Sequence, residues 1–214
     1  MMTMILDTLS GLDHIHPEDI PDIDLYMDQV TTYMETQLAQ SKRYPDDKIL
    51  TKTMINNYAK NDLLPSPEKK RYSKEHLLLL IFIYYFKNFL SISDIKTLLD
   101  PITEKYYKAD TDQDMTYIYD EVFSMEKGQI ERLEKELIKQ YRVAASTFQD
   151  AGEEEREKLI RFSFICLLSF DVYVKKMMVE RMIDEMRPAE PPKKEKKSKK
   201  NHSGETLKKN DQPE

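Results

Sequence analysis

Residues 50–99 decide the fold of this chain and read LTKTMINNYAKNDLLPSPEKKRYSKEHLLLLIFIYYFKNFLSISDIKTLL. A short helical pattern comes first, a basic loop broken by prolines follows it, and two further helical patterns end the stretch. A short helix followed by a turn and a basic excursion is typical of a helix-turn-helix with a wing, which places one helix in a groove of DNA. No other segment of the chain indicates so specific a function.

Hydroxyl side chains precede each of the three helical patterns. An N-cap hydroxyl accepts a backbone N–H in the first turn of its helix. The caps are Thr51 before a helix to about residue 60, Ser73 before a helix to about residue 89, and Ser91 before a helix to about residue 100. The second pattern is hydrophobic nearly all round, so we expect it in the centre of the core. We expect Asp100-Pro101 to end the third, because proline removes a backbone donor.

The residues before this stretch divide into an acidic arm and one further helix. Residues 1–24 contain prolines and no basic side chain, and we expect an acidic N-terminal arm that is extended on the surface. From Leu25 to about Ala39, apolar residues recur at helical spacing. We therefore place a helix-turn-helix domain at residues 25–100.

The residues after the stretch predict a long helical pair and a tail. An amphipathic pattern runs over about 112–148, a glycine break follows, and a second helix is predicted over 153–186. Two helices with a short break favour an antiparallel hairpin within 101–186. Residues 187–214 are basic, of low complexity and without apolar periodicity, so we expect a disordered tail.

The composition favours an all-α protein. The chain of 214 residues has 4 glycines, and 34% of its side chains are charged. A net charge of −6 argues against a nucleic-acid binder, but the distribution of charge does not. Residues 1–41 hold eight acidic and no basic side chains, whereas residues 42–76 hold nine basic and five acidic ones. A basic module therefore lies within an acidic chain, and the charge of that module is the more informative value.

Enzymatic and metal-binding functions have little support in the sequence. Glycine-rich phosphate loops, GxSxG and HExxH are absent, and His76 is expected to be a cap or core residue. Cys166 is the only cysteine, which excludes a cysteine zinc cluster, and its apolar surroundings predict a buried side chain. His14 and His16 form only a weak metal pair. We therefore expect no enzyme, no cofactor and no metal.

The sequence also lacks segments that would direct the chain to a membrane. The amino terminus has neither the basic nor the apolar region of a signal peptide. The longest apolar run, Leu77–Phe86, is shorter than the roughly 20 residues of a transmembrane helix. We expect a cytoplasmic protein with no membrane partner.

The first helix and the loop of the stretch contain residue types that contact DNA. Met54, Ile55 and Tyr58 are spaced to anchor the helix. Asn pairs bidentately with adenine in the major groove, Lys and Thr suit phosphates, and the loop is placed to contact flanking phosphates. The candidate DNA-binding residues are Lys52, Thr53, Asn56, Asn57, Lys60, Lys69, Lys70, Arg71 and Tyr72. A solvated helix followed by a basic loop would show the same periodicity and charge.

These residues resemble the DNA-binding domain of MerR-type regulators. That pattern has a helix ending in Tyr, a Leu-Leu-Pro turn, a basic wing with Tyr before a capping Ser, and a helix pair. The matching residues are Ile55, Tyr58, Leu63, Leu64, Pro65, Tyr72 and Ser73. Through IPDIDLYMDQVTTYM and LTKTMINNYAKNDLLP, residues from about 10 to 180 more closely resemble an uncharacterised bacterial family, mostly from Firmicutes, of MerR-like proteins with no assigned function.

The resemblance implies a fold and a partner. The fold is a MerR-like winged helix-turn-helix followed by the helical hairpin. Because MerR-type proteins dimerise through a helix after the DNA-binding domain, a homodimer through residues 112–186 is implied. The hairpin packing only on its own module is the alternative.

The chain also departs from the MerR-type pattern. Asn56 and Asn57 stand where typical members carry Arg followed by Tyr, and Asp62 replaces the usual turn glycine. The loop before the helix is also longer. The base preference of MerR-type proteins therefore does not carry over to this chain.

Two functions remain open from the sequence. The first is a dimeric, MerR-like transcriptional regulator that binds double-stranded DNA. The second is a helical interaction or adaptor protein that keeps the fold without sequence-specific DNA binding. The acidic net charge and the missing arginine favour the second, and the constellation in residues 50–99 favours the first.

Overall fold

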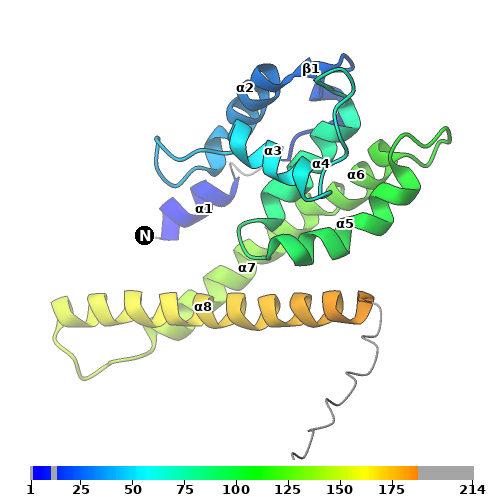
Figure 1. The fold of residues 1–214 in the computed structure, drawn as a ribbon. Coiled ribbons are helices and arrows are strands. Elements are labelled where there is room, and N and C mark those ends of the chain that lie inside the picture. Colours follow the sequence, from blue (N-terminus) through cyan, green and yellow to red (C-terminus); the bar gives the residue numbers. More distant parts are fainter. Residues whose placement is uncertain (1, 11–13, 188–214) are drawn as a thin grey trace, which may run out of the picture.

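The structure, a computed structural model, describes residues 2–10 and 14–187 and is almost entirely helical (Figure 1). Its elements in chain order are α1 (Met2–Ser10), η1 (Pro17–Asp19), β1 (Leu25–Tyr26), α2 (Met27–Gln37), η2 (Ala39–Ser41), α3 (Lys52–Lys60), β2 (Arg71–Tyr72), α4 (Lys74–Phe86), α5 (Ile92–Tyr106), α6 (Met115–Phe123), α7 (Glu126–Ala145) and α8 (Glu153–Met186). The prediction of an all-α protein is confirmed. Apart from Arg187, the predicted disordered tail lies outside the described residues.

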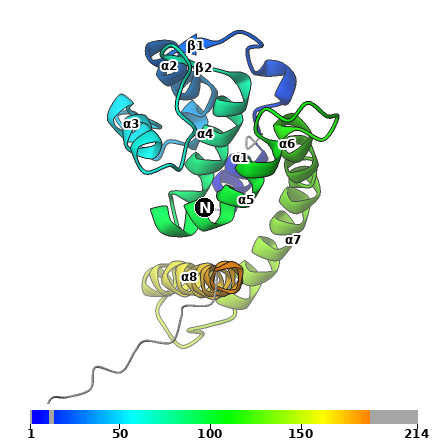
Figure 2. The ribbon, with the colours of Figure 1, turned by 45° about the vertical axis from the view of Figure 1, so that its right-hand side comes forward.

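Helix α4 forms the centre of the core, as its composition predicts. Residues 77–83 are all at most 6% exposed. Figure 2 shows α2 and α3 on one side of α4 and α6 on the other. Val30, Met34 and Ile55 from the first side belong to the same apolar cluster as Tyr119 from α6. One core therefore joins the helices from α2 to α6, and each large apolar side chain buried in it contributes about 2 kcal/mol.

Two of the predicted caps start their helices through the expected hydrogen bonds. Thr51 Oγ1 accepts the backbone N–H of Met54 at 3.2 Å. Ser91 Oγ accepts the N–H of Asp94 at 3.1 Å, and the Asp94 carboxylate accepts the N–H of Ser91 at 3.2 Å, which completes a capping box. The hydrogen bond from the Ser91 hydroxyl also lowers the pKa of Asp94. Each cap of this kind stabilises its helix by about 1 kcal/mol.

The expectation that Asp100-Pro101 ends a helix is wrong. Helix α5 continues to Tyr106 with Pro101 in its interior. An interior proline removes a hydrogen bond and costs about 3 kcal/mol. Ile102 and Tyr106, in the turns after the proline, pack against the main core, and burial of their apolar surface offsets this cost. The proline itself lies on the exposed side of the helix.

The acidic arm is not an extended surface segment. Residues 2–10 form α1, and Pro17–Asp19 form a single 3-10 turn. Ile15 and Ile20 are 4% and 2% exposed, and the Tyr119 hydroxyl donates to the Ile15 carbonyl at 2.7 Å. The isoleucines between the acidic residues therefore anchor the arm to the core.

The amphipathic pattern over 112–148 forms two helices instead of one. Helix α6 ends at Phe123, and α7 begins at Glu126 after a short turn. The rings of Tyr119 and Phe123 each lie 5.5 Å from the ring of Phe82, centroid to centroid. These contacts hold α6 against α4, whereas α7 leaves the domain (Figure 2). Side-chain periodicity can continue across such a turn, so the pattern did not reveal it.

Helix α8 has the bounds that the sequence predicts, but it diverges from α7. Around the end of α7, the rings of Tyr141 and Phe164 of α8 lie 5.5 Å apart. In the same region Gln140 Nε2 donates to the Asp171 carboxylate at 2.5 Å. Farther from this region the helices separate (Figure 2). The two helices run in opposite directions but cross at an angle, so that the end of α7 meets α8 near its middle (Figure 1).

The carboxyl-terminal half of α8 packs beneath α5. Ile183 is 2% exposed, and Val179 packs against the main core. Arg187 Nη2 donates to Asp94 Oδ1 at 2.5 Å. These contacts explain why α8 leaves α7. Among the described residues, no helix combines the length and the apolar character that crossing a lipid bilayer requires.

Candidate nucleic-acid interface

Helix α3 separates its apolar and polar side chains onto opposite faces. Ile55 and Tyr58 are 0% and 5% exposed, and Met54 packs against the same core. Burial raises the pKa of the Tyr58 hydroxyl. The polar residues recur at one-turn spacing and are all exposed: Lys52, Thr53, Asn56, Asn57 and Lys60. The helix therefore presents one polar face with the residue types that read bases and bind phosphates.

The turn after α3 keeps a glycine-like geometry without glycine. Asp62 has a φ of 54°. The N–H of Leu63 donates to the Tyr58 carbonyl at 2.9 Å, and the N–H of Asp62 donates to the Ala59 carbonyl at 3.3 Å. These two bonds define a Schellman motif. Because aspartate tolerates a left-handed backbone better than most residues do, replacing the usual glycine has not removed the turn.

A short basic loop with a tight turn follows, and we call residues 66–72 the wing. Strand β1 pairs antiparallel with β2, so that Leu25 is opposite Tyr72 and Tyr26 is opposite Arg71. Glu68 and Arg71 form a further bridge, and the N–H of Arg71 donates to the Glu68 carbonyl at 2.8 Å. The segment before α2 thus supplies the strand that holds the wing.

Two lysines form the tip of the wing. Lys69 and Lys70 have φ values of 48° and 65°. Positive φ at both central positions of a two-residue connection is typical of a type I′ turn, which favours Asn-Gly. A left-handed conformation costs a residue with a Cβ about 1 kcal/mol. The tip therefore holds two exposed cations at a conformational cost.

The two residues of β2 have opposite environments. Arg71 is exposed, and its Nε and Nη2 donate to the Tyr26 hydroxyl at 3.3 and 3.2 Å. Tyr72 is 3% exposed, and its ring packs edge-on against His76 with centroids 5.4 Å apart. Burial raises the pKa of the Tyr72 hydroxyl. Tyr72 is therefore a core residue, whereas the other eight candidate DNA-binding residues are exposed.

His76 ties the wing to the domain. It is 1% exposed, and its Nδ1 accepts the N–H of Ser73 at 2.9 Å. The Tyr107 hydroxyl lies 3.0 Å from its Nε2. Burial lowers the pKa of His76, so its neutral form is favoured. His76 is a cap and core residue, as the sequence predicts.

Carboxylates accompany some of the cations near this surface. Lys52 forms an ion pair with Asp28 of α2. Lys108 forms an ion pair with Glu68 of the wing, and the hydrogen bond from Lys108 lowers the pKa of Glu68. Within residues 2–10 and 14–187, the interface lysines that form no ion pair are Lys60, Lys69 and Lys70.

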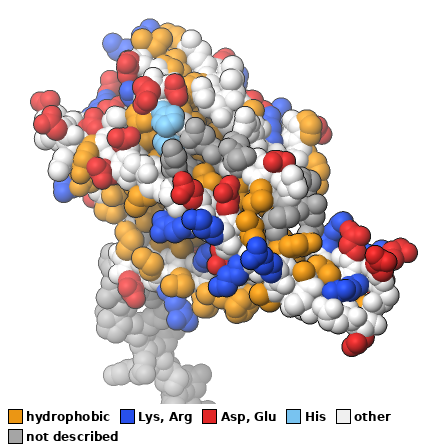
Figure 3. Space-filling view, turned by 180° about the vertical axis from the view of Figure 1, so that it is seen from behind, with side chains coloured by type: hydrophobic (Ala, Val, Ile, Leu, Met, Phe, Trp, Pro, Cys, Tyr) orange, Lys and Arg blue, Asp and Glu red, His pale blue; other side chains and the backbone are white. Residues whose placement is uncertain are grey.

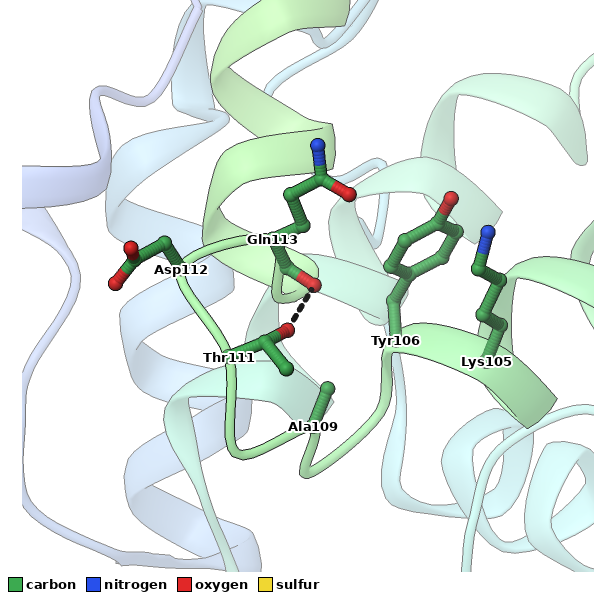
Figure 4. Close-up of a pocket in the computed structure, with 6 residues that line it drawn as sticks. All are labelled: Lys105, Tyr106, Ala109, Thr111, Asp112 and Gln113. Atoms are coloured by element: carbon green, nitrogen blue, oxygen red, sulfur yellow. Dashed lines mark hydrogen bonds between the residues drawn. The ribbon is translucent and has the colours of Figure 1, made fainter.

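A depression of about 450 Å³ lies beyond the end of α5 (Figure 4). Its lining residues are Lys105, Tyr106, Ala109, Thr111, Asp112 and Gln113. The Thr111 hydroxyl donates to the Gln113 carbonyl at 3.0 Å, and Asp112 points away from Lys105 (Figure 4). The polar groups do not converge on one point as those of an active site do. In the described part of the chain, no three His, Cys, Asp or Glu side chains are grouped to hold a metal ion.

A second surface lies on α8, within the residues 112–186 through which the sequence resemblance implies a homodimer. Eight of its apolar side chains are between 47% and 66% exposed: Phe162, Ile165, Phe170, Val172, Tyr173, Met178, Met182 and Met186. Figure 3 shows exposed hydrophobic side chains interspersed with Lys and Arg side chains on the lower half of the molecule. Cys166 is exposed as well, so the prediction of a buried cysteine is wrong. The helix has more apolar residues than α5 and α7 cover. Five of them, from Phe162 to Tyr173, lie on one side of the helix by their helical spacing, and we call these five the α8 apolar surface.

Comparison with known proteins gives a family but no function. A family model described as a domain of unknown function, DUF1836, matches residues 15–122, which is about half of the chain. The matched region covers the candidate interface and the core on which it rests. No curated protein and no solved structure matches the chain.

Proposed function

The chain belongs to the DUF1836 family, and we propose that it is a transcriptional regulator that binds double-stranded DNA with α3 and the wing. The observation that carries the proposal is the pair of lysines at the strained wing tip. A tip selected for stability alone would hold Asn-Gly. Residues held in unfavourable backbone conformations are concentrated at functional sites. Two adjacent cations at the tip suit the phosphates of a DNA strand.

The order of the elements gives the proposal a second support. Strand β1, helices α2 and α3, strand β2, and helices α4 and α5 follow one another in the order expected for the proposed winged helix-turn-helix, with 14 residues between α2 and α3. In this arrangement α3 is the recognition helix. Asn56 and Asn57 are then the base-reading residues, with adenine the base that their amides pair with best. Lys52, Thr53 and Lys60 are assigned to phosphates.

The proposal includes a homodimer formed through α7 and α8. The five exposed apolar side chains of the α8 apolar surface lie on one side of the helix, and grouped exposed apolar residues are typical of association sites. Helix-turn-helix proteins that dimerise read two half-sites about one helical turn of DNA apart. The α8 apolar surface is therefore assigned to a second copy of the chain.

Binding to genomic DNA fragments tests the proposal directly. The variant Lys69→Ala/Lys70→Ala/Arg71→Ala should lose at least about 30-fold in affinity, because three phosphate contacts are removed. The matched control, Lys135→Ala/Lys139→Ala/Lys175→Ala, removes the same charge from exposed positions on α7 and α8. It should bind like the wild type. Equal losses of DNA affinity in both variants would show that binding depends only on net charge, which would contradict the proposal.

An adaptor protein that retains this fold without sequence-specific DNA binding is the second candidate. The observation that favours it is the α8 apolar surface, together with the net charge of −6. Under this hypothesis, no DNA fragment is enriched over random sequence at any salt concentration. Selection and sequencing of bound fragments therefore separates the two functions.

A further inference from the structure

We propose that the exposed carboxylates of residues 18–28 compete with DNA for cations at the margin of the interface. This inference rests on the proposed function, and it concerns how binding at that same site is regulated. We call residues 18–28 the acidic segment. Its role would be that of a built-in phosphate mimic, which weakens binding until phosphates displace it.

The acidic segment lies directly beside the wing. It contains β1, whose Tyr26 pairs with Arg71 of β2. It has five acidic side chains and no basic one, and all five are exposed: Glu18, Asp19, Asp22, Asp24 and Asp28. Because β1 is hydrogen-bonded to the wing strand, the position of these carboxylates relative to the wing is fixed.

Two carboxylates of the acidic segment form ion pairs with lysines, each of which is the first residue of a helix. Asp28 pairs with Lys52, the first residue of α3. Asp22 Oδ1 lies 2.9 Å from the Nζ of Lys74, the first residue of α4. Between these pairs, the Tyr26 hydroxyl accepts hydrogen bonds from Arg71. Three cations that border the proposed interface are therefore already engaged.

These contacts can be displaced by phosphate. The side chains of Lys52 and Asp28 are 59% and 76% exposed, and those of Lys74 and Asp22 are 25% and 86% exposed. Ion pairs this open to water contribute little. The carboxylate itself does not leave when its pair breaks, because Asp28 belongs to the first turn of α2, where the helix dipole favours it. It would then repel the incoming phosphate.

Among the described residues, the lysines at the tip of the wing form no ion pair with the acidic segment. No ion pair engages Lys69, Lys70 or Lys60 within the residues that the structure describes. DNA phosphates therefore contact the tip first. Lys52 and Lys74 bind phosphate only after it has replaced Asp28 and Asp22 as their partners. Binding would be weaker and more easily reversed than the number of exposed cations predicts.

Neutralising single carboxylates tests the inference. Binding to a labelled duplex of mixed sequence, about 30 base pairs long, is measured by fluorescence anisotropy at low salt. Asp28→Asn should tighten binding by about threefold, and Asp22→Asn/Asp28→Asn by more. Asp24→Asn is the matched control, since Asp24 is exposed in the same segment and holds no cation in the described structure. It should change affinity less than Asp28→Asn does.

A double-variant cycle identifies the cation. In the Lys52→Ala background, Asp28→Asn should lose most of its effect, because the lysine that it releases is absent. Asp28→Glu keeps the charge and should bind like the wild type. Circular dichroism melting of each variant establishes that α2 remains folded.

The two proposals fail in different ways. If the wild type binds and Asp28→Asn binds DNA no more tightly than Asp24→Asn does, the proposed competition by the acidic segment is overturned. The proposed DNA-binding function is unaffected by that result. If Asp28→Asn tightens binding just as much in the Lys52→Ala background, the proposed competition by the acidic segment is also overturned. If neither the wild type nor any variant binds the duplex at low salt, the proposed function fails and the inference fails with it.

Discussion

The domain around α4 and the α7–α8 pair use similar apolar content in opposite ways. In α4, residues 77–83 are at most 6% exposed, whereas on α8 eight apolar side chains are at least 47% exposed. The first region covers its apolar residues with neighbouring helices of the same chain. The second leaves them in water in the described structure. Exposed apolar side chains grouped on one helix are typical of association surfaces, and the proposed homodimer would bury them.

The same contrast separates the proposed DNA-binding surface from the proposed dimerisation surface. Helix α3 and the wing rest on the buried core, so their geometry is fixed before any partner arrives. The α8 apolar surface lies outside that core and is assigned to a second copy. Each prediction below would break or sharpen this contrast.

The largest effect is expected in the core. Leu80→Ala, at a fully buried position of α4, should lower the free energy of unfolding by about 3 kcal/mol. Phe170→Ala, at a position 65% exposed, should change the stability of the monomer by less than about 0.5 kcal/mol. Urea unfolding at low protein concentration measures both. Similar losses in the two variants would show that α8 is packed as tightly as α4.

A smaller effect is expected on self-association. Ile165→Asp/Tyr173→Asp places two charges on the α8 apolar surface and should weaken the dimer by at least about 2 kcal/mol. Gln40→Asp/Gln149→Asp adds the same charge at exposed polar positions and should leave the dimer intact. Light scattering at micromolar concentration gives the mass of each. A monomeric wild type would rule out the dimer.

The wing tip should show opposite effects on stability and on binding. Lys69→Asn/Lys70→Gly supplies the residues that a type I′ turn favours and should raise the free energy of unfolding by about 1 kcal/mol. It should also weaken DNA binding, because both cations are lost. Lys69→Ala/Lys70→Ala is the control, which should weaken binding without the gain in stability. A tip variant that is no more stable than the wild type would argue against strain at the lysines.

The smallest effect concerns pH. Burial lowers the pKa of His76 below its unfolded value of about 6.5. The unfolded chain therefore binds the proton more readily, and the contribution of His76 to stability is lost as pH falls through that value. Urea midpoints between about pH 7.5 and pH 5.5 should decline less in His76→Gln than in the wild type. Equal declines of the urea midpoint in the two proteins would show that a group other than His76 causes the pH dependence.

Local signals in the sequence were sufficient where one segment determines its own structure. Thr51 and Ser91 cap their helices through bonds within four residues, and the bounds of α8 follow from the glycine before it and the change in composition after it. Partners distant in sequence decided the rest. Burial of Ile102 and Tyr106 carries α5 past Pro101, and α8 leaves α7 because Ile183 packs elsewhere. Periodicity shows that a face is apolar but not what covers it.

The candidate site was also only partly predictable from the sequence. The exposed polar face of α3 follows from residue spacing alone, and eight of the nine candidate residues are exposed. Tyr72 is buried because strand pairing turns alternate residues of β2 to opposite sides, which a basic loop does not reveal. The nearby carboxylates Asp22 and Asp28 were also missed, since β1 brings these flanking residues to the wing from a segment that lies far away in the sequence.

The salt dependence of DNA binding tests the central claim most directly. Each phosphate that a lysine neutralises contributes about 0.9 to the slope of log affinity against log salt concentration. The wild type should bind a genomic fragment with a steep slope, and Lys69→Ala/Lys70→Ala should reduce that slope by nearly 2. A wild type without saturable binding at low salt, or a variant with an unchanged slope, would contradict a DNA interface formed by α3 and the wing.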